Sequence, residues 1–276
     1  MPAPLLLLLA GIVALAVPTL TSLAREYWGT DNGVHGPLLL VSGVWLIWRS
    51  RSILRVRADL PAVGWLLLAL VPLLVIYVYG RAMSVLFVES FALYLLLVTL
   101  AFYYWGPQVM RQLWFPALYL AFLVRPPAGM VAEFTQPVKI WISQAATDLL
   151  QAADYPIAHS GVKIQIAQYE LLVQQACAGL GSIFSLLAIG LLYLHLASPS
   201  RGWKRLFLLA SIIPLAVVAN LLRVILLILI TVHFGEAAAQ GISHEATGIL
   251  TFALSLLGLY LLDQLVTRRT PEQVLT

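Results

Sequence analysis

The chain has 276 residues, of which 61% are hydrophobic and only 10% are charged. This composition lies far from that of a soluble globular domain, and it predicts an all-α polytopic membrane protein. The formal net charge of +4 comes from basic residues between apolar segments, so we do not expect a nucleic-acid partner. The single cysteine excludes an internal disulfide and leaves a thiol or thiolate as its only chemical form.

Eight apolar segments are candidates for membrane spans, because a span needs about 20 apolar residues. They are residues 5–23, 37–48, 62–79, 85–104, 113–124, 179–196, 206–232 and 246–266. The second and fifth are short, and Pro116, Pro126 and Pro127 indicate that the fifth is broken or only partly inserted, so seven or nine spans are alternatives. We predict a single integral-membrane domain over residues 1–276, with residues 125–176 as an insert outside the membrane.

Basic residues gather in the connections on one side of the predicted spans. The clusters are at residues 49–57, 111, 201–205 and 268–269, and eight spans place all of them on the same side. Short loops rich in Lys and Arg face the cytoplasm. We therefore expect the protein to lie in a bacterial cytoplasmic (inner) membrane with both termini on the cytoplasmic side. The opposite, outer side then receives residues 25–36, 80–83, 125–176 and 233–245.

The insert at 125–176 carries two patterns. Apolar residues recur at helical spacing between Val131 and Leu149, which predicts an amphipathic helix on the outer leaflet. Residues 162–167 then alternate between apolar and polar or small side chains, and residues 170–173 follow after a short polar break, which predicts a small β-hairpin. That hairpin leads directly to the cysteine, Cys177.

Three residues, Cys177, Arg223 and His244, are predicted to lie at one depth near the outer membrane surface. Cys177 and His244 lie at outer, N-terminal ends of spans, where the helix dipole favours a thiolate and a neutral imidazole. Arg223 is 17 residues beyond Leu206, which places it about 25 Å from the cytoplasmic boundary at 1.5 Å per residue. The alternatives are a buried cysteine acting as a small hydrophobe, an arginine reaching lipid phosphates and a loop histidine.

Four further polar residues are candidates for a supporting role. Asn220 precedes Arg223 by three residues and so shares its helical face. Glu89 lies inside the fourth span, where it either pairs with Arg223 or is interfacial. Asp31 and His35 belong to the first outer loop and either line the site or are solvated. The histidines have no metal-ligand spacing, so we expect no metal, and no sequence pattern calls for a cofactor.

Five short segments with characteristic residues follow one another along the chain. They are Tyr27-Trp28 with Asp31 and His35-Gly36; Phe115-Pro116-Ala117 through Arg125-Pro126-Pro127; Cys177-Ala178-Gly179-Leu180; Pro214-Leu215-Ala216 leading to Asn220 and Arg223; and His244 with Gly248 and Phe252. In this order they resemble the signature segments of the exosortase/archaeosortase family, over about residues 27–262. Ala178 and Gln174 stand where many relatives have Ser and an acidic residue, which indicates a divergent subtype.

The resemblance implies an integral-membrane cysteine transpeptidase. Its substrates would be secreted proteins with a C-terminal tripartite sorting signal: a short PEP-like motif, a transmembrane helix and a basic end. Such an enzyme would cleave near the motif at the outer face of the membrane and transfer the protein to an acceptor that the sequence does not identify. By position, Cys177 would be the nucleophile, Arg223 the oxyanion or thiolate stabiliser and His244 the proton-transfer residue.

Two other classes of function are alternatives. A transporter would use Arg223 and Glu89 as substrate or proton-coupling groups and would be indifferent to replacement of Cys177. A non-catalytic assembly factor for envelope polysaccharide (exopolysaccharide) export would tolerate the loss of Cys177, Arg223 and His244 together. Dependence on the thiol therefore separates the first hypothesis from the other two.

Overall fold

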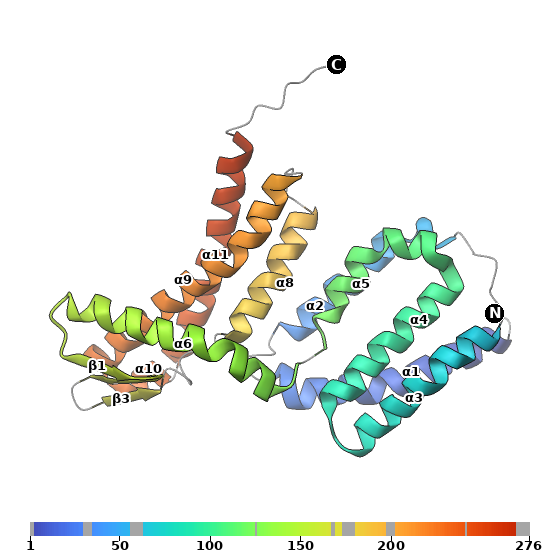
Figure 1. Cartoon of the computed structure of the whole chain (residues 1–276), viewed down its shortest axis with the longest axis horizontal. Helices are drawn as coiled ribbons and strands as arrows, with labels where there is room; N and C mark the ends of the chain where they lie inside the picture. The colour runs from blue at the N-terminus through green and yellow to red at the C-terminus, as the bar shows by residue number, and fades with distance from the viewer. Residues whose placement is uncertain are drawn as a thin grey trace. The chain divides into compact units, whose positions relative to one another are not determined.

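The structure is a computed structural model in which helices make up most of the described chain (Figure 1). It describes residues 3–29, 35–55, 63–124, 126–166, 169–172, 180–196, 202–240 and 242–268. The chain divides into two compact units, Met1–Ala128 and Gly129–Thr276. Each unit has its own packing and is described by itself.

The first unit is entirely helical in its described residues. Its elements are α1 (Ala3–Leu23) continued by the π-helix η1 (Ala24–Trp28), α2 (Gly36–Arg49), the short 3₁₀ turn η2 (Ile53–Arg55), α3 (Val63–Ala82), α4 (Leu86–Gln112) and α5 (Trp114–Ala121). Helices α3 and α4 form an antiparallel pair, and α1 packs along α4 (Figure 1). All of these elements except η2 lie on one of the predicted apolar segments or its borders, and η2 lies in the predicted basic connection at 49–57.

A polar network joins α1, α3 and α4 inside this unit. Glu89 is 3% exposed, and its Oε1 accepts hydrogen bonds from Arg81 Nη1 at 2.8 Å and from Thr19 Oγ1 at 2.7 Å. Tyr77 OH is 3.1 Å from the same Thr19 hydroxyl and donates to the Leu15 carbonyl at 2.9 Å. A buried carboxylate needs such partners because desolvation penalises its charge. The pairing that the structure gives Glu89 is therefore with Arg81.

Helix α4 is bent near its C-terminal end. Gly106 has φ 72° and ψ 175°, outside the helical region, and Pro107 follows it. Glycine tolerates this left-handed φ because it has no Cβ, and proline lacks the N–H that would continue the helical ladder. The 27 residues of α4 therefore form one long helix up to the glycine and a second, short helix after it.

The second unit combines helices with a small sheet. Its elements are α6 (Ala128–Gln151), β1 (Ile157–Ser160), β2 (Lys163–Ile166), β3 (Tyr169–Leu172), α8 (Leu180–Leu196), α9 (Trp203–Phe234), α10 (Glu236–Gln240) and α11 (Ile242–Arg268). The strands form an antiparallel sheet in the order β1-β2-β3, with Ile164 opposite His159 and Leu171. The predicted hairpin is confirmed as β2 and β3, and β1 adds a strand that the pattern did not reveal.

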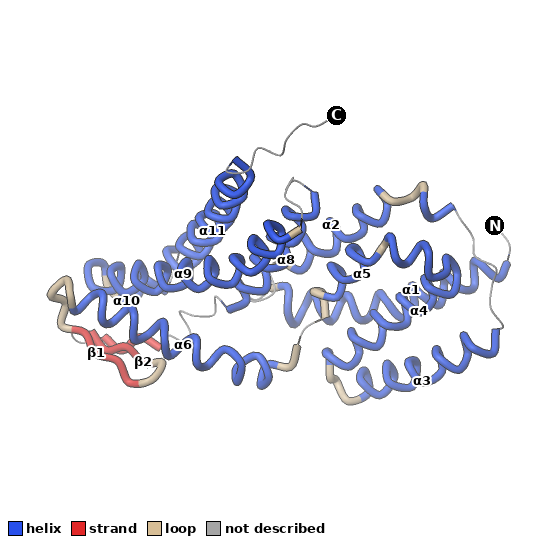
Figure 2. The backbone as a smooth tube through the Cα atoms, turned by 45° about the horizontal axis from the view of Figure 1, so that its top comes forward, coloured by secondary structure: helices blue, strands red, loops and turns tan. Residues whose placement is uncertain are grey.

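Helix α6 and the three strands together form a cap, and the cap packs on α9 (Figure 2). Its core holds Ile142 of α6 and Ile164 of β2, both 0% exposed, against Val224 and Ile228 of α9. The predicted helix in the insert is confirmed. The face of α6 that includes Ile142 packs against the sheet and α9, whereas Trp141 lies on another face and is 53% exposed.

Helices α8, α9 and α11 form the apolar bundle of the second unit. Leu208 and Ile212 of α9 are fully buried against Leu186 of α8 and Leu259 of α11. Helix α9 has 32 residues, which gives a length of about 48 Å, well above the roughly 30 Å of a bilayer core. It therefore supports both the bundle and the cap.

Five helices in the described part of the chain are long and apolar enough to cross a membrane. They are Leu6–Trp28, Val63–Ala82, Leu86–Gln112, Trp203–Phe234 and Ala246–Val266. The predicted span at 113–124 forms only the eight residues of α5, about 12 Å of helix, in agreement with the interruption expected from its prolines. Every predicted apolar segment contains a helix, but eight full spans are not confirmed.

Candidate active site

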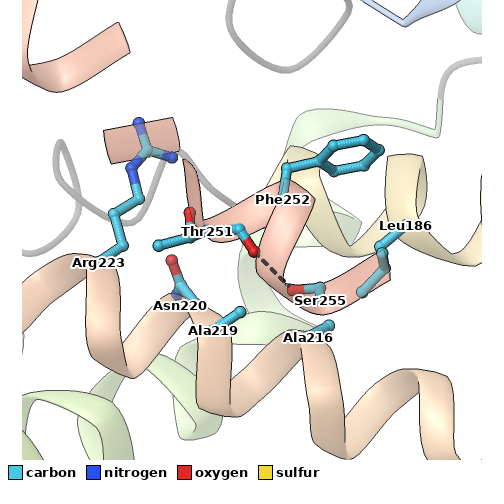
Figure 3. A pocket seen from close by; sticks show the side chains of 8 residues that line it. All are labelled: Leu186, Ala216, Ala219, Asn220, Arg223, Thr251, Phe252 and Ser255. Carbon is cyan, nitrogen blue, oxygen red and sulfur yellow. Dashed lines mark hydrogen bonds between the residues drawn. The ribbon is translucent and has the colours of Figure 1, made fainter. Parts of the chain in front are cut away.

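Arg223 lies inside the helix bundle of the second unit. Its side chain extends from α9 toward α11 and is 5% exposed (Figure 3). The alternative in which it reaches lipid phosphates is wrong, because that would require the guanidinium to leave the bundle. An arginine in an apolar bundle normally faces a partner or a functional cavity.

Asn220 shares the environment of Arg223, as its spacing predicted. It is also 5% exposed, and both residues line a small cavity with Thr251 and Ser255 of α11 (Figure 3). The hydroxyls of Thr251 and Ser255 donate to backbone carbonyls four residues earlier, at 2.7 and 2.8 Å. Each oxygen keeps lone pairs that accept hydrogen bonds. The cavity has a volume of about 10 Å³, roughly the space of one water molecule.

Gly248 brings α11 directly against the guanidinium of Arg223. A Cβ at Gly248 would lie 3.3 Å from Nη2, 3.4 Å from Cζ and 3.7 Å from Nη1 of Arg223. Any larger residue would therefore press on the guanidinium. His244 precedes Gly248 by one helical turn in the same helix, about 6 Å along its axis. The backbone thus brings the predicted positions 223 and 244 to one corner of the bundle.

Helix α8, which begins three residues after Cys177, lies beside the same corner. It runs antiparallel to α9 (Figure 1), and Leu186 of α8 lines the same cavity as Asn220. Leu180 is six residues nearer the helix start than Leu186, about 9 Å, so it lies near the depth of Arg223. Cys177 precedes Leu180 by three residues and lies outside the described residues.

The other predicted supporting residues belong to the first unit. His35 stands just before α2 and is 8% exposed, and burial lowers the pKa of its imidazole below the usual 6.5. Glu89 is held by Arg81 and Thr19. Asp31 lies outside the described residues. A role for these three residues in the site stays a prediction.

Residues 28–261 match the family model described as transmembrane exosortase. The chain belongs to the exosortase family. Comparison with curated proteins returned no match, and neither did comparison with solved structures. The matched range spans most of the chain, including Arg223, His244 and the position of Cys177.

As an exosortase, the protein is a membrane-embedded sorting enzyme, and its family acts on proteins that bear sorting signals. Sequence reasoning missed two residues of the corner in this exosortase, Thr251 and Ser255. A signal was present: Thr247, Thr251 and Ser255 recur every four residues in an otherwise apolar helix, and all three are buried. Hydroxyls at this spacing line one helical face.

Proposed function

We propose that this exosortase is a cysteine peptidase/transpeptidase that cleaves C-terminal sorting signals of secreted proteins and transfers the proteins to a surface acceptor. The observation that carries the proposal is the burial of Arg223 beside Asn220 and against Gly248, one helical turn after His244. Two of the three predicted catalytic positions, from different helices, thus share one corner. The helix that follows the third, Cys177, lines the same cavity through Leu186.

The chemistry follows from these three side chains. His244, neutral before the reaction, takes the proton of the Cys177 thiol, and the thiolate attacks the carbonyl carbon of the scissile peptide bond while the guanidinium of Arg223 stabilises the resulting oxyanion. His244 donates a proton to the departing amine, which leaves a thioester on Cys177. An acceptor amine or water then attacks the thioester, His244 takes the proton of this nucleophile, and the thiolate is regenerated.

The helix ends support these roles. Cys177 precedes the N-terminal end of α8, and His244 lies in the first turn of α11. The positive end of a helix dipole favours a thiolate and keeps an imidazole neutral, so that it accepts protons. Three residues of chain span at most about 11 Å, so Cys177 stays within that distance of Leu180. No metal or cofactor is needed for this reaction.

The proposal includes a topology and a supporting set. We place both termini in the cytoplasm and the corner of Arg223 at the outer face of a bacterial inner membrane, crossed by eight segments, because all basic clusters then face inward. Asn220 orients Arg223 from the same helical face. Asp31, His35 and Glu89 stay candidates for a supporting role.

The test compares the envelope proteomes of cells that express the wild type and cells that express Cys177→Ala, scoring proteins that keep a C-terminal hydrophobic tail. We expect a defined set of tailed precursors to accumulate in the mutant, and their shared sequence to give the recognition motif. Alanine preserves a small apolar side chain, so a cysteine with only a packing role would tolerate the change.

The matched control is Gly258→Ala, a substitution of similar size on α11 and away from Arg223. Both variants are first shown to be present in the membrane at wild-type levels. Identical proteomes for wild type and Cys177→Ala would refute thiol catalysis and favour the transporter or the polysaccharide-assembly factor. A transporter would lose function with Arg223→Gln while tolerating Cys177→Ala, whereas an assembly factor would tolerate both.

A further inference from the structure

The first unit contains a large apolar cavity that the proposed chemistry does not use. It has a volume of about 390 Å³, is partly open at the surface, and is lined by side chains of α1, α2, α4, α5 and the turn after α5. On the straight part of α4, before Gly106, its lining extends from Ser90 to Trp105, a helical distance of about 22 Å, and Met110 lines it beyond the kink. The cavity is therefore long and runs along most of the straight part of α4.

Water is a poor occupant of this cavity. Only four of the lining side chains carry a nitrogen or oxygen atom, and each of these atoms already makes a hydrogen bond inside the protein. The bonds are Thr19 Oγ1 to Glu89 Oε1 at 2.7 Å, Ser90 Oγ to the Leu86 carbonyl at 2.7 Å, Tyr94 OH to the Ala117 carbonyl at 2.9 Å and Trp105 Nε1 to the Leu54 carbonyl at 3.0 Å. A buried water needs two to four polar partners, which these walls do not supply.

The size of the cavity selects among apolar occupants. The total empty space of the cavity is about 1300 Å³. A helix 10 Å in diameter occupies roughly 1,700 Å³ over the same length of about 22 Å, so the cavity is too small to hold a transmembrane helix. A saturated hydrocarbon chain advances about 1.3 Å per carbon, because carbon–carbon bonds are about 1.5 Å long, so about 17 carbons match the length.

The charges at the two ends of the cavity differ. At the Trp105 end, the bond to Leu54 holds α4 against the turn after α2. Arg49 and Arg51 are exposed beside this turn. The guanidinium carbon of Arg49 lies 5.5 Å from the ring centre of Trp45, and that of Arg51 lies 4.6 Å from the ring centre of Trp48. At the Ser90 end, the nearby Arg81 is already paired with Glu89. The exposed pair Arg49 and Arg51 therefore offers two neighbouring cations to an anionic headgroup at the Trp105 end.

We propose that this cavity binds one acyl chain of an anionic phospholipid, with the phosphate held by Arg49 and Arg51. A chain of 16 to 18 carbons fills the cavity from Trp105 toward Ser90. The lipid acts as a bound structural component of the first unit. This inference does not depend on Cys177. An experiment can therefore disprove lipid binding without affecting the proposed processing activity, and it can disprove the processing activity without affecting lipid binding.

The experiment is native mass spectrometry of the delipidated full-length protein, titrated with phosphatidylglycerol carrying 16- and 18-carbon chains. We expect one phospholipid per chain to stay bound at activation energies that remove all others. Ala101→Phe places a ring in the cavity and should lower the bound fraction at least tenfold. The control is Ala14→Phe, which adds the same ring on an exposed position of α1 that does not line the cavity.

Two arms need no cavity variant. Phosphatidylglycerol with 8-carbon chains should bind at least tenfold more weakly than the long-chain lipid, and Arg49→Gln with Arg51→Gln should lower its affinity to that of phosphatidylcholine. Equal retention by Ala101→Phe and Ala14→Phe, or equal affinity for short and long chains, would overturn the acyl-chain site. Recovery of an isoprenoid lipid as the tightly bound species would overturn the phospholipid assignment.

Discussion

A single methyl group at Gly248 tests whether the position of Arg223 controls catalysis. In Gly248→Ala the new Cβ would lie 3.3 Å from Nη2 and 3.4 Å from Cζ, so the guanidinium must move by a few tenths of an ångström. A displacement of about 1 Å in an active site costs about 100-fold in rate, so a shift of this size corresponds to roughly 5- to 10-fold. We expect the turnover number to fall by that factor with little change in KM, because oxyanion stabilisation acts in the transition state.

The assay follows conversion of a tailed precursor to its processed form in membranes that contain equal amounts of each variant. Gly258→Ala is the matched control, because its methyl would meet the flexible Leu215 Cδ2 at 3.2 Å, away from Arg223. Both changes raise helix propensity by about 1 kcal/mol, so this contribution cancels in the comparison. Equal activity of the two variants would show that Arg223 does not act from the position described.

Three further predictions concern Arg223, Glu89 and His35. Arg223→Lys should lower processing at least 100-fold in the same assay, because an ammonium lacks the planar fork of the guanidinium, while Arg111→Lys, at an exposed position, should stay near wild type. Glu89→Gln should lower the free energy of unfolding in detergent by about 1–2 kcal/mol, a value reduced because Arg81 is 44% exposed; an equal effect from exposed Glu133→Gln would contradict this. Because the pKa of His35 is lower in the folded state, the unfolded state takes up a proton at a higher pH than the folded state does. The free energy of unfolding should therefore be constant above about pH 6.5 and should fall as the pH drops below it. A thermal-unfolding series from pH 7.5 to 5 should show this slope, and His35→Gln should reduce it.

Apolar runs predicted the helices well because a membrane span is a local property of the sequence. Each predicted segment contains a helix, and the alternation at 162–167 located β2. Apolar spacing did not show which part of α6 other protein elements cover: Ile142 is buried, whereas Phe134 and Trp141 are exposed. Which face of α6 is covered depends on the sheet and on Val224 of α9, which are distant in sequence. β1 was missed because its four residues carry no clear alternation.

The sequence predicted those residues of the site that are conspicuous as polar residues in an otherwise apolar helix. Arg223 and Asn220 stand out in an apolar helix, and their burial together confirms the shared face. Thr251 and Ser255 were harder to find because hydroxyl side chains are common in membrane helices, where they bond to their own backbone. The contact of Gly248 with Arg223 depends on how α9 and α11 cross. The spacing of residues within one helix gives no information about this crossing.

The cap and the guanidinium are attached to adjacent turns of one uninterrupted helix. Val224 and Ile228 carry the core of the cap, and Arg223 is the residue before Val224 on α9. Their separation is therefore set by the 1.5 Å rise of the helix and does not vary with the thickness of the bilayer. A polypeptide held by the cap would meet the guanidinium at a constant number of residues from its point of contact. Under the proposed function, α9 would therefore fix the distance between the point of contact with the cap and the bond that is cut.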